Sequence, residues 1–257
     1  MTPEFPEPPG IPELAQPPAE FPDDAPFWGY QDLAIFIGLL PLCMIAGALI
    51  AKSLMLALHA TVLPKAAELL PAQFAGYGLL FGALAWMFRV QYGRPFWKSL
   101  AWTRFPTPLG IVVSRGVVLA FVVVLLGAVL RVPEVDSPIK QLLKDRTSML
   151  LVVIAGTTIG PVCEELAFRG FMQTLFVRSL GAVPGVLLAG FCFGLLHLPQ
   201  YGFSWRHALL ITVAGAAFGW MRHASRSTAA AALMHASYNL TLFLGALAAG
   251  KDMPKTW

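Results

Sequence analysis

Charged residues are scarce in this sequence of 257 residues. Asp, Glu, Lys and Arg make up 12% of the chain, whereas 57% of its residues are hydrophobic. Soluble domains usually carry about 25% charged residues, so this composition excludes an ordinary water-soluble fold. The net charge of +4 comes from basic residues that are scattered and not clustered in one motif, which argues against binding of nucleic acid. Contact with anionic lipid headgroups explains them better.

Cysteine is also scarce. Cys43, Cys163 and Cys192 are odd in number and lack the close spacing of metal or redox motifs, so we expect buried small hydrophobic residues. Cys163 adjoins Glu164, which raises the alternative of a cysteine protease. A nucleophilic thiol needs a base beside it and a lowered pKa, and nothing in the sequence places such a base there.

Long apolar runs are abundant. About 20 apolar residues span a bilayer core, and four runs of nearly this length or longer contain no Asp, Glu, Lys or Arg: residues 33–51, 69–88, 180–198 and 227–250. Three shorter uncharged runs add further candidates: residues 116–130, 148–163 and 208–221. The sequence therefore predicts an all-α, polytopic transmembrane helix bundle of about seven or eight helices, the eighth lying in residues 53–67.

Residues 1–31 differ from the rest of the chain. They contain nine prolines, six acidic residues and no Lys or Arg. Such a composition cannot pack a core, so we expect a solvated, disordered leader. The segment also lacks the basic region of a signal peptide, and the run 33–51 is therefore expected to remain as the first span.

Three polar clusters interrupt the apolar runs of the second half, where buried ionisable groups are costly and are functional candidates by default. In the first, Glu165 and Arg169 lie four residues apart and can form an ion pair on one helix face. Glu164 points about 100° away around the helix and is left free to face a cavity. The structural alternative is a helix end emerging among lipid headgroups.

The other two clusters supply histidines. His197 ends the run 180–198, and His235 lies four residues before Asn239 within the run 227–250. Each could be a packing residue that holds helices together. Their conjunction with a glutamate on a third helix instead indicates a site that activates water, because a carboxylate can accept its proton and a histidine with an amide can stabilise an oxyanion.

The order and spacing of these residues resemble the CPBP family, which contains CAAX-type prenyl endopeptidases and bacterial relatives described as abortive-infection proteins. The resemblance covers roughly residues 148–250. Its three motifs are intact: EExxxR at Glu164, Glu165 and Arg169, FxxxH at Phe193 and His197, and HxxxN at His235 and Asn239.

The resemblance implies an intramembrane endopeptidase that hydrolyses a peptide bond in or near the membrane. Glu164 and His197 would activate the water, His235 and Asn239 would form the oxyanion hole, and Glu165 with Arg169 would brace the helix. The partners would be the lipid bilayer and a peptide or protein substrate, with prenylated CAAX proteins as the best-known case. The location would be the inner or plasma membrane if the source is bacterial.

The interpretation as a membrane endopeptidase divides the chain into four parts. A leader (1–31) precedes N-terminal transmembrane helices (32–147), a transmembrane catalytic core (148–250) and a C-terminal tail (251–257). Two rival functions stay open: a proton-coupled transporter, which also places polar groups in its spans, and a non-catalytic scaffold with the same fold.

The cofactor also stays open. Glu164, His197 and His235 offer one oxygen and two nitrogens, a set that zinc accepts with water as fourth ligand. The two histidines lack the HExxH spacing that presents two ligands from one helix turn. We therefore favour a glutamate-driven site without a cofactor, with zinc as the alternative.

Overall fold

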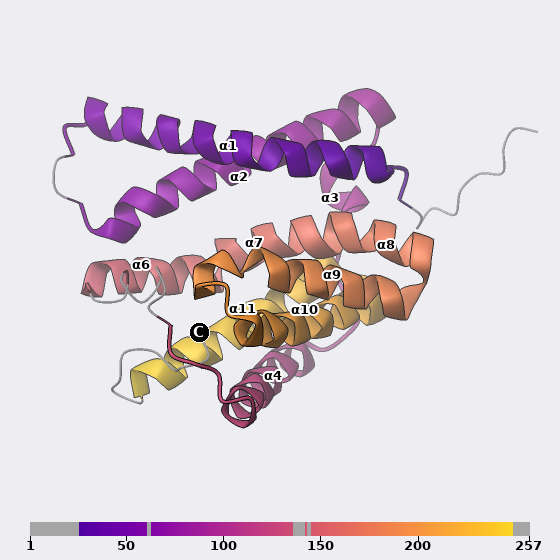
Figure 1. Cartoon of the computed structure of the whole chain (residues 1–257). Helices are drawn as coiled ribbons and strands as arrows, with labels where there is room; N and C mark the ends of the chain where they lie inside the picture. Colours follow the sequence, from indigo (N-terminus) through magenta and orange to yellow (C-terminus); the bar gives the residue numbers. More distant parts are fainter. Residues whose placement is uncertain (1–25, 61–62, 136–141, 143–144, 249–257) are drawn as a thin grey trace, which may run out of the picture.

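The computed structural model describes residues 26–60, 63–135, 142 and 145–248, in which helices joined by short loops occur and no strand does. Helices α1 (Tyr30–Ala57) and α2 (Lys65–Tyr92) form a hairpin that lies over the rest of the molecule (Figure 1). The predicted all-α class is confirmed.

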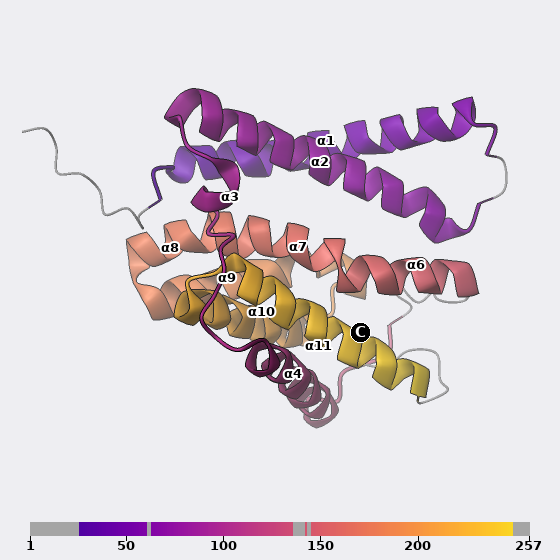
Figure 2. The same cartoon turned by 180° about the vertical axis from the view of Figure 1, so that it is seen from behind.

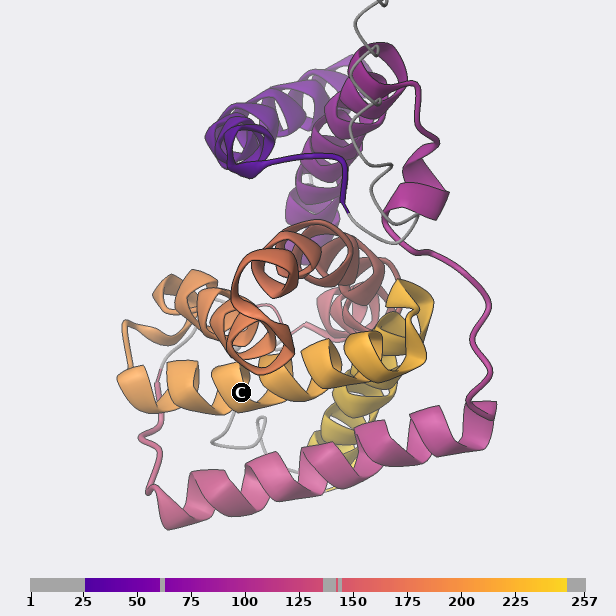
Figure 3. The same cartoon turned by 90° about the vertical axis from the view of Figure 1, so that its right-hand side faces the viewer.

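The remaining elements form the body beneath the hairpin. In chain order they are α3 (Phe96–Ser99), α4 (Leu109–Val129), α6 (Arg146–Thr157), α7 (Ile159–Glu165), the π-helix η1 (Leu166–Met172), α8 (Gln173–Leu180), α9 (Ala182–Leu196), the 3-10 helix η2 (Pro199–Tyr201), α10 (Trp205–Ser225) and α11 (Thr228–Ala248). Seen from behind, α11 passes below α6 and α7 and beside α4 (Figure 2). Viewed end-on, α4 lies at the far edge of the body from the hairpin (Figure 3).

Within the described residues, five helical segments are long and apolar enough to cross a membrane: Tyr30–Ala57, Lys65–Tyr92, Leu109–Val129, Arg146–Leu180 and Thr228–Ala248. Helix α9 is apolar but has 15 residues. The chain is an integral, multi-pass membrane protein. Many large apolar side chains, such as Leu42, Phe121 and Leu187, are exposed on helix surfaces, as expected where lipid is the solvent.

The described residues of the range 53–67, which are 53–60 and 63–67, form no helix separate from α1 and α2. Helix α1 continues to Ala57, α2 begins at Lys65, and His59 lies between them with a left-handed φ of 52°. His59 is exposed and is thus not a core histidine.

The predicted leader extends too far toward the first helix. Trp28 is 2% exposed, and its ring stacks on Phe88 and Phe171 at centroid distances of 5.2 and 5.3 Å. Its indole Nε1 donates a hydrogen bond to the Phe171 carbonyl (3.2 Å). The prediction that residues up to 31 cannot pack a core is therefore wrong for this segment, because one large aromatic side chain outweighs the average composition. The predicted disorder of residues 1–25 lies outside the described residues.

Glycines set the close approach of α9 and α10. A Cβ at Gly190 would lie 2.7 Å from the backbone nitrogen of Ala216, and one at Gly215 would lie 3.2 Å from the Gly190 Cα. Gly190 and Gly215 thus lie at a helix crossing, where only a hydrogen fits.

Candidate active site

A break in the fourth candidate span positions the site. Helix α6 ends at Thr157 and α7 begins at Ile159, because Thr158 has non-helical dihedrals (φ −128°, ψ −91°). The Gly156 carbonyl, near this break, accepts a hydrogen bond from the Asn239 amide Nδ2 (2.7 Å). Irregular backbone at membrane depth is tolerated where it is buried or lines a cavity.

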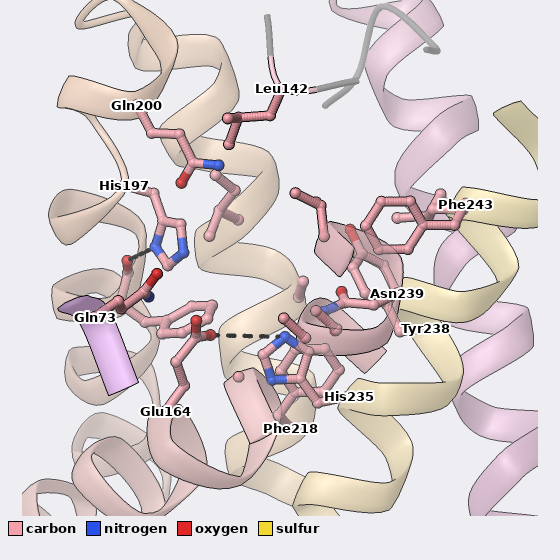
Figure 4. Close-up of a pocket in the computed structure, with 18 of the residues that line it drawn as sticks. Gln73, Leu142, Glu164, His197, Gln200, Phe218, His235, Tyr238, Asn239 and Phe243 are labelled. Carbon is pink, nitrogen blue, oxygen red and sulfur yellow. Dashed lines mark hydrogen bonds and ion pairs between the residues drawn. The ribbon is translucent and has the colours of Figure 1, made fainter. Parts of the chain in front are cut away.

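A cavity of about 350 Å³ opens at this break, between α2, α6, α7, α9, α10 and α11. Its polar lining residues are Gln73, Glu164, His197, Gln200, Tyr201, His235, Tyr238 and Asn239. The volume suits a few residues of a peptide or a small ligand. Figure 4 shows Glu164 and His197 on one side of this space and His235 and Asn239 on the other.

Glu164 faces the cavity, as the helical geometry predicts. Its side chain is 25% exposed, and its Oε2 lies 3.8 Å from Nε2 of His235. This separation exceeds that of a hydrogen bond, so the carboxylate lies near the histidine without a hydrogen bond to it.

Glu165 is fully buried and contacts two partners. Its Oε1 accepts a hydrogen bond from Arg169 Nη1 (3.0 Å) and lies 2.9 Å from His235 Nδ1. The predicted ion pair is present. A carboxylate oxygen accepts hydrogen bonds, so Nδ1 of His235 carries the proton and Nε2 is the ring nitrogen on the side of Glu164.

Arg169 links the ion pair to the neighbouring helix. Its Nη2 donates to the Gly215 carbonyl of α10 (2.7 Å), and its guanidinium lies 4.5 Å from the Phe193 ring centroid. Both residues of the pair are 0% exposed. The carboxylate, the carbonyl and the aromatic face each stabilise the buried guanidinium, while Arg169 Nε and Glu165 Oε2 have no hydrogen-bond partner among the described residues.

His197 follows the last residue of α9. Its Nδ1 lies 2.8 Å from the carbonyl oxygen of Phe193, four residues earlier. Nδ1 must donate to this oxygen, which leaves Nε2 of the neutral ring as an acceptor. The FxxxH spacing thus lets the backbone of Phe193 fix the histidine ring.

Aromatic rings hold His235 from the other sides. Phe218 stacks on it at a centroid distance of 4.4 Å, and Phe193 meets it edge-on at 5.8 Å. His235 is 4% exposed. The ring therefore has little freedom to turn.

The zinc alternative requires Glu164, His197 and His235 to point toward one position. Among the described residues, no group of three or more His, Cys, Asp or Glu side chains is placed to hold a metal ion. Glu164, His197 and His235 line one cavity but do not form such a set, and Nδ1 of each histidine faces an oxygen acceptor.

Sequence reasoning missed four polar residues of the cavity, one of which is Tyr238 of α11. Gln73 comes from α2, and Gln200 and Tyr201 come from η2. Burial, together with the negative charge of Glu164, raises the pKa of Tyr201, so this phenol stays neutral. Tyr201 stacks on His207 at 4.7 Å. His207 is 1% exposed and is therefore a core residue, not the interfacial residue its place beside a span indicates.

The cysteines lie elsewhere. Cys43, Cys163 and Cys192 are free thiols of intermediate exposure, so burial is less complete than expected. None of the three belongs to the cavity lining. The geometry thus gives no support to the alternative of a cysteine protease.

Comparison with known proteins bears on the second half of the chain. Residues 146–241 match the family model "Type II CAAX prenyl endopeptidase Rce1-like". This confirms the resemblance drawn from the three motifs, all of which lie within the matched residues. No curated protein and no solved structure matches the chain. At the level of the family, the match supports a CAAX-type membrane protease.

Proposed function

We propose that this chain, Rce1-like in residues 146–241, is an intramembrane endopeptidase of the CAAX-processing type in which Glu164 activates the attacking water. One observation carries the proposal. The Glu164 carboxylate shares a cavity with His197, His235 and Asn239, while its neighbour Glu165 is bound to Arg169. One glutamate is thus available for proton transfer and the other is held in place.

The first step is water activation. Glu164 accepts a proton from a water molecule, and the free Nε2 of His197 accepts a second hydrogen bond that orients the same water. The water oxygen then attacks the carbonyl carbon of the peptide bond. The carbonyl π electrons move to the oxygen, which becomes an oxyanion.

The second step is collapse of the tetrahedral intermediate. Protonated Glu164 returns its proton to the leaving nitrogen, the C–N bond breaks, and a carboxylic acid and an amine are released. His235, with a carboxylate near each ring nitrogen, can carry protons on both and can then donate from Nε2 to the oxyanion. The Asn239 amide can donate its second hydrogen.

The membrane setting fits a substrate that partitions into lipid. The apolar lining residues include Leu70, Phe74, Val152, Leu242 and Phe243, which suit an apolar side chain or lipid group. A prenylated CAAX peptide is the first substrate to test. If the source is bacterial, the inner or plasma membrane is the place of action.

The test is cleavage of a farnesylated CAAX peptide by purified protein in detergent. Glu164→Gln keeps the shape and removes the base, so we expect nearly all turnover to be lost, as we also do for His197→Ala. Cys163→Ala is the matched control and should stay active. Full activity of Glu164→Gln, or a folded but inactive Cys163→Ala, would contradict the mechanism. Cleavage without an ion gradient also separates a peptidase from a transporter or a scaffold.

A further inference from the structure

Helix α2 contributes a wall of the cavity from outside the matched residues 146–241. Leu70, Gln73 and Phe74 all line the space. Their i, i+3, i+4 spacing places them on one face of the helix. The N-terminal hairpin is thus part of the site and not only a neighbouring membrane anchor.

Gln73 is the polar residue of this face. It lies within an apolar span, where polar side chains are expected to have a function. Its Nε2 donates to the Tyr77 hydroxyl one turn along (3.1 Å). Figure 4 shows Gln73 on the same side of the cavity as Glu164 and His197. A primary amide has two donors and an acceptor, so one bond to Tyr77 leaves capacity for a ligand.

The position of this face is fixed at two points. The Ala66 amide donates to Ser148 Oγ of α6 (3.1 Å), and both residues are buried. Further along, Gly76 lets α1 approach, because a Cβ there would lie 3.1 Å from the Cys43 carbonyl oxygen. Gln73 lies between these two points, at which α2 contacts α6 and α1 respectively.

We propose that Gln73 binds the peptide backbone of the substrate beside the scissile bond. Its amide matches the carbonyl and N–H of one peptide unit, while Leu70 and Phe74 pack against the adjoining apolar side chain. Among the lining residues that the structure describes there is no Lys or Arg, and the polar group of the α2 wall is a neutral amide, which pairs with another neutral amide. The inference rests on the proposed function and names how the same site holds its substrate.

The chain offers a matched control for the test. Gln91 lies on the same helix, is exposed like Gln73, and donates to a tyrosine hydroxyl, that of Tyr92 (3.2 Å), but is not part of the cavity lining. Gln73→Met and Gln91→Met therefore make the same chemical change inside and outside the site. Gln73→Asn shortens the amide and serves as a second variant.

The readout is the division of the effect between KM and kcat for a farnesylated CAAX peptide. Removing a bond made equally in ground and transition states raises KM and spares kcat. We expect Gln73→Met to raise KM about tenfold, Gln73→Asn to raise it less, and Gln91→Met to leave it unchanged. Equal effects at positions 73 and 91, or a fall in kcat with unchanged KM, would overturn the proposal.

A binding measurement separates this proposal from the proposed function. A fluorescent farnesylated CAAX peptide is titrated into Glu164→Gln protein with and without Gln73→Met, so affinity is read without cleavage. We expect about tenfold weaker binding in the double variant. Equal affinity in the two would reject the role of Gln73 even if the enzyme cleaves. Failure of the wild type to cleave a peptide that still binds through Gln73 would instead reject the proposed reaction.

Discussion

Two adjacent glutamates in this protein have opposite environments. The side chain of Glu164 is 25% exposed to the cavity, whereas that of Glu165 is 0% exposed and shared between Arg169 and His235. Neighbouring positions on a helix point about 100° apart, and that rotation separates the carboxylate proposed to react from the carboxylate held by Arg169 and His235. The second glutamate thus does more than brace the helix, since it also orients His235.

The oxyanion donors that we propose, His235 and Asn239, give a prediction at this scale. We expect His235→Ala and Asn239→Ala each to lower kcat by about 10² to 10³, because each removes one donor to the developing charge. Steady-state rates with the farnesylated peptide measure the loss, and size-exclusion profiles check that the variants fold. A change of less than threefold in both would remove these residues from the mechanism.

The buried ion pair gives a prediction about stability. Arg169→Ala leaves Glu165 charged and without its cation, which costs about 3 to 5 kcal/mol for a buried pair. We expect a clear fall in Tm or in the yield of folded protein, and the same for Glu165→Ala. Arg89→Ala, which changes an exposed arginine of α2, is the control. Normal thermal stability in both variants of the pair would contradict a structural role.

At the scale of elements, the π-helix η1 and the glycines of α10 work together. Arg169, within the wider turn of η1, donates a hydrogen bond to the Gly215 carbonyl of α10. Gln173, four residues later, donates to the Gly219 carbonyl (2.9 Å). π-helical turns are frequent at functional sites. Two side chains bonded to carbonyls of α10 hold the helix that carries both glutamates.

Helix packing in the lipid interior depends on these small residues. Gly190→Ala places a methyl group 2.7 Å from the Ala216 nitrogen, so α9 and α10 must separate, and His197 at the end of α9 must move with it. We expect a lower Tm and a loss of cleavage. Gly82→Ala, with nothing within 4 Å of its added methyl group, should leave both unchanged. Equal Tm values for the two variants would show that the crossing is not tight.

At the scale of the molecule, local pattern predicts part of the fold and site well. Five of the apolar runs correspond to the candidate spans, whereas the runs 180–198 and 208–221 correspond to α9 and α10, which are not among those spans. The four-residue spacing of Glu165 and Arg169 predicted their ion pair, since such a pair depends only on the helix period. The contact of Glu165 with His235 joins residues 70 positions apart. It depends on how two helices rotate against each other, and neither helix encodes that alone.

Two further differences have physical causes. Gln73 lies in the run 69–88, which contains no Glu or His, so no cluster of catalytic residue types marks it, although its amide lines the cavity. The boundary at residue 31 came from average composition, and averages hide a single tryptophan. Contacts that join the two halves of the chain are the part that sequence pattern does not reveal.

Trp28 is such a contact and supports the last prediction. Its ring lies between Phe88 of α2 and Phe171 of η1, and its indole bonds to the Phe171 carbonyl. It therefore fastens the N-terminal hairpin, which carries Gln73, to the helix that carries Glu165 and Arg169. Loss of a buried tryptophan costs about 3 to 5 kcal/mol, so we expect Trp28→Ala to lower Tm strongly and to raise KM as the α2 wall shifts.

Truncations locate the same boundary. Removal of residues 1–25, which are rich in proline and acidic residues, should leave Tm and cleavage unchanged. Removal of residues 1–31 should instead lower Tm and raise KM, as we expect for Trp28→Ala. Trp97→Ala, at a tryptophan that is 54% exposed, controls for the chemical change. A stable and active enzyme after deletion of residues 1–31 would contradict this role of Trp28. The remaining contacts around Phe171 would then be enough to hold the hairpin on the body.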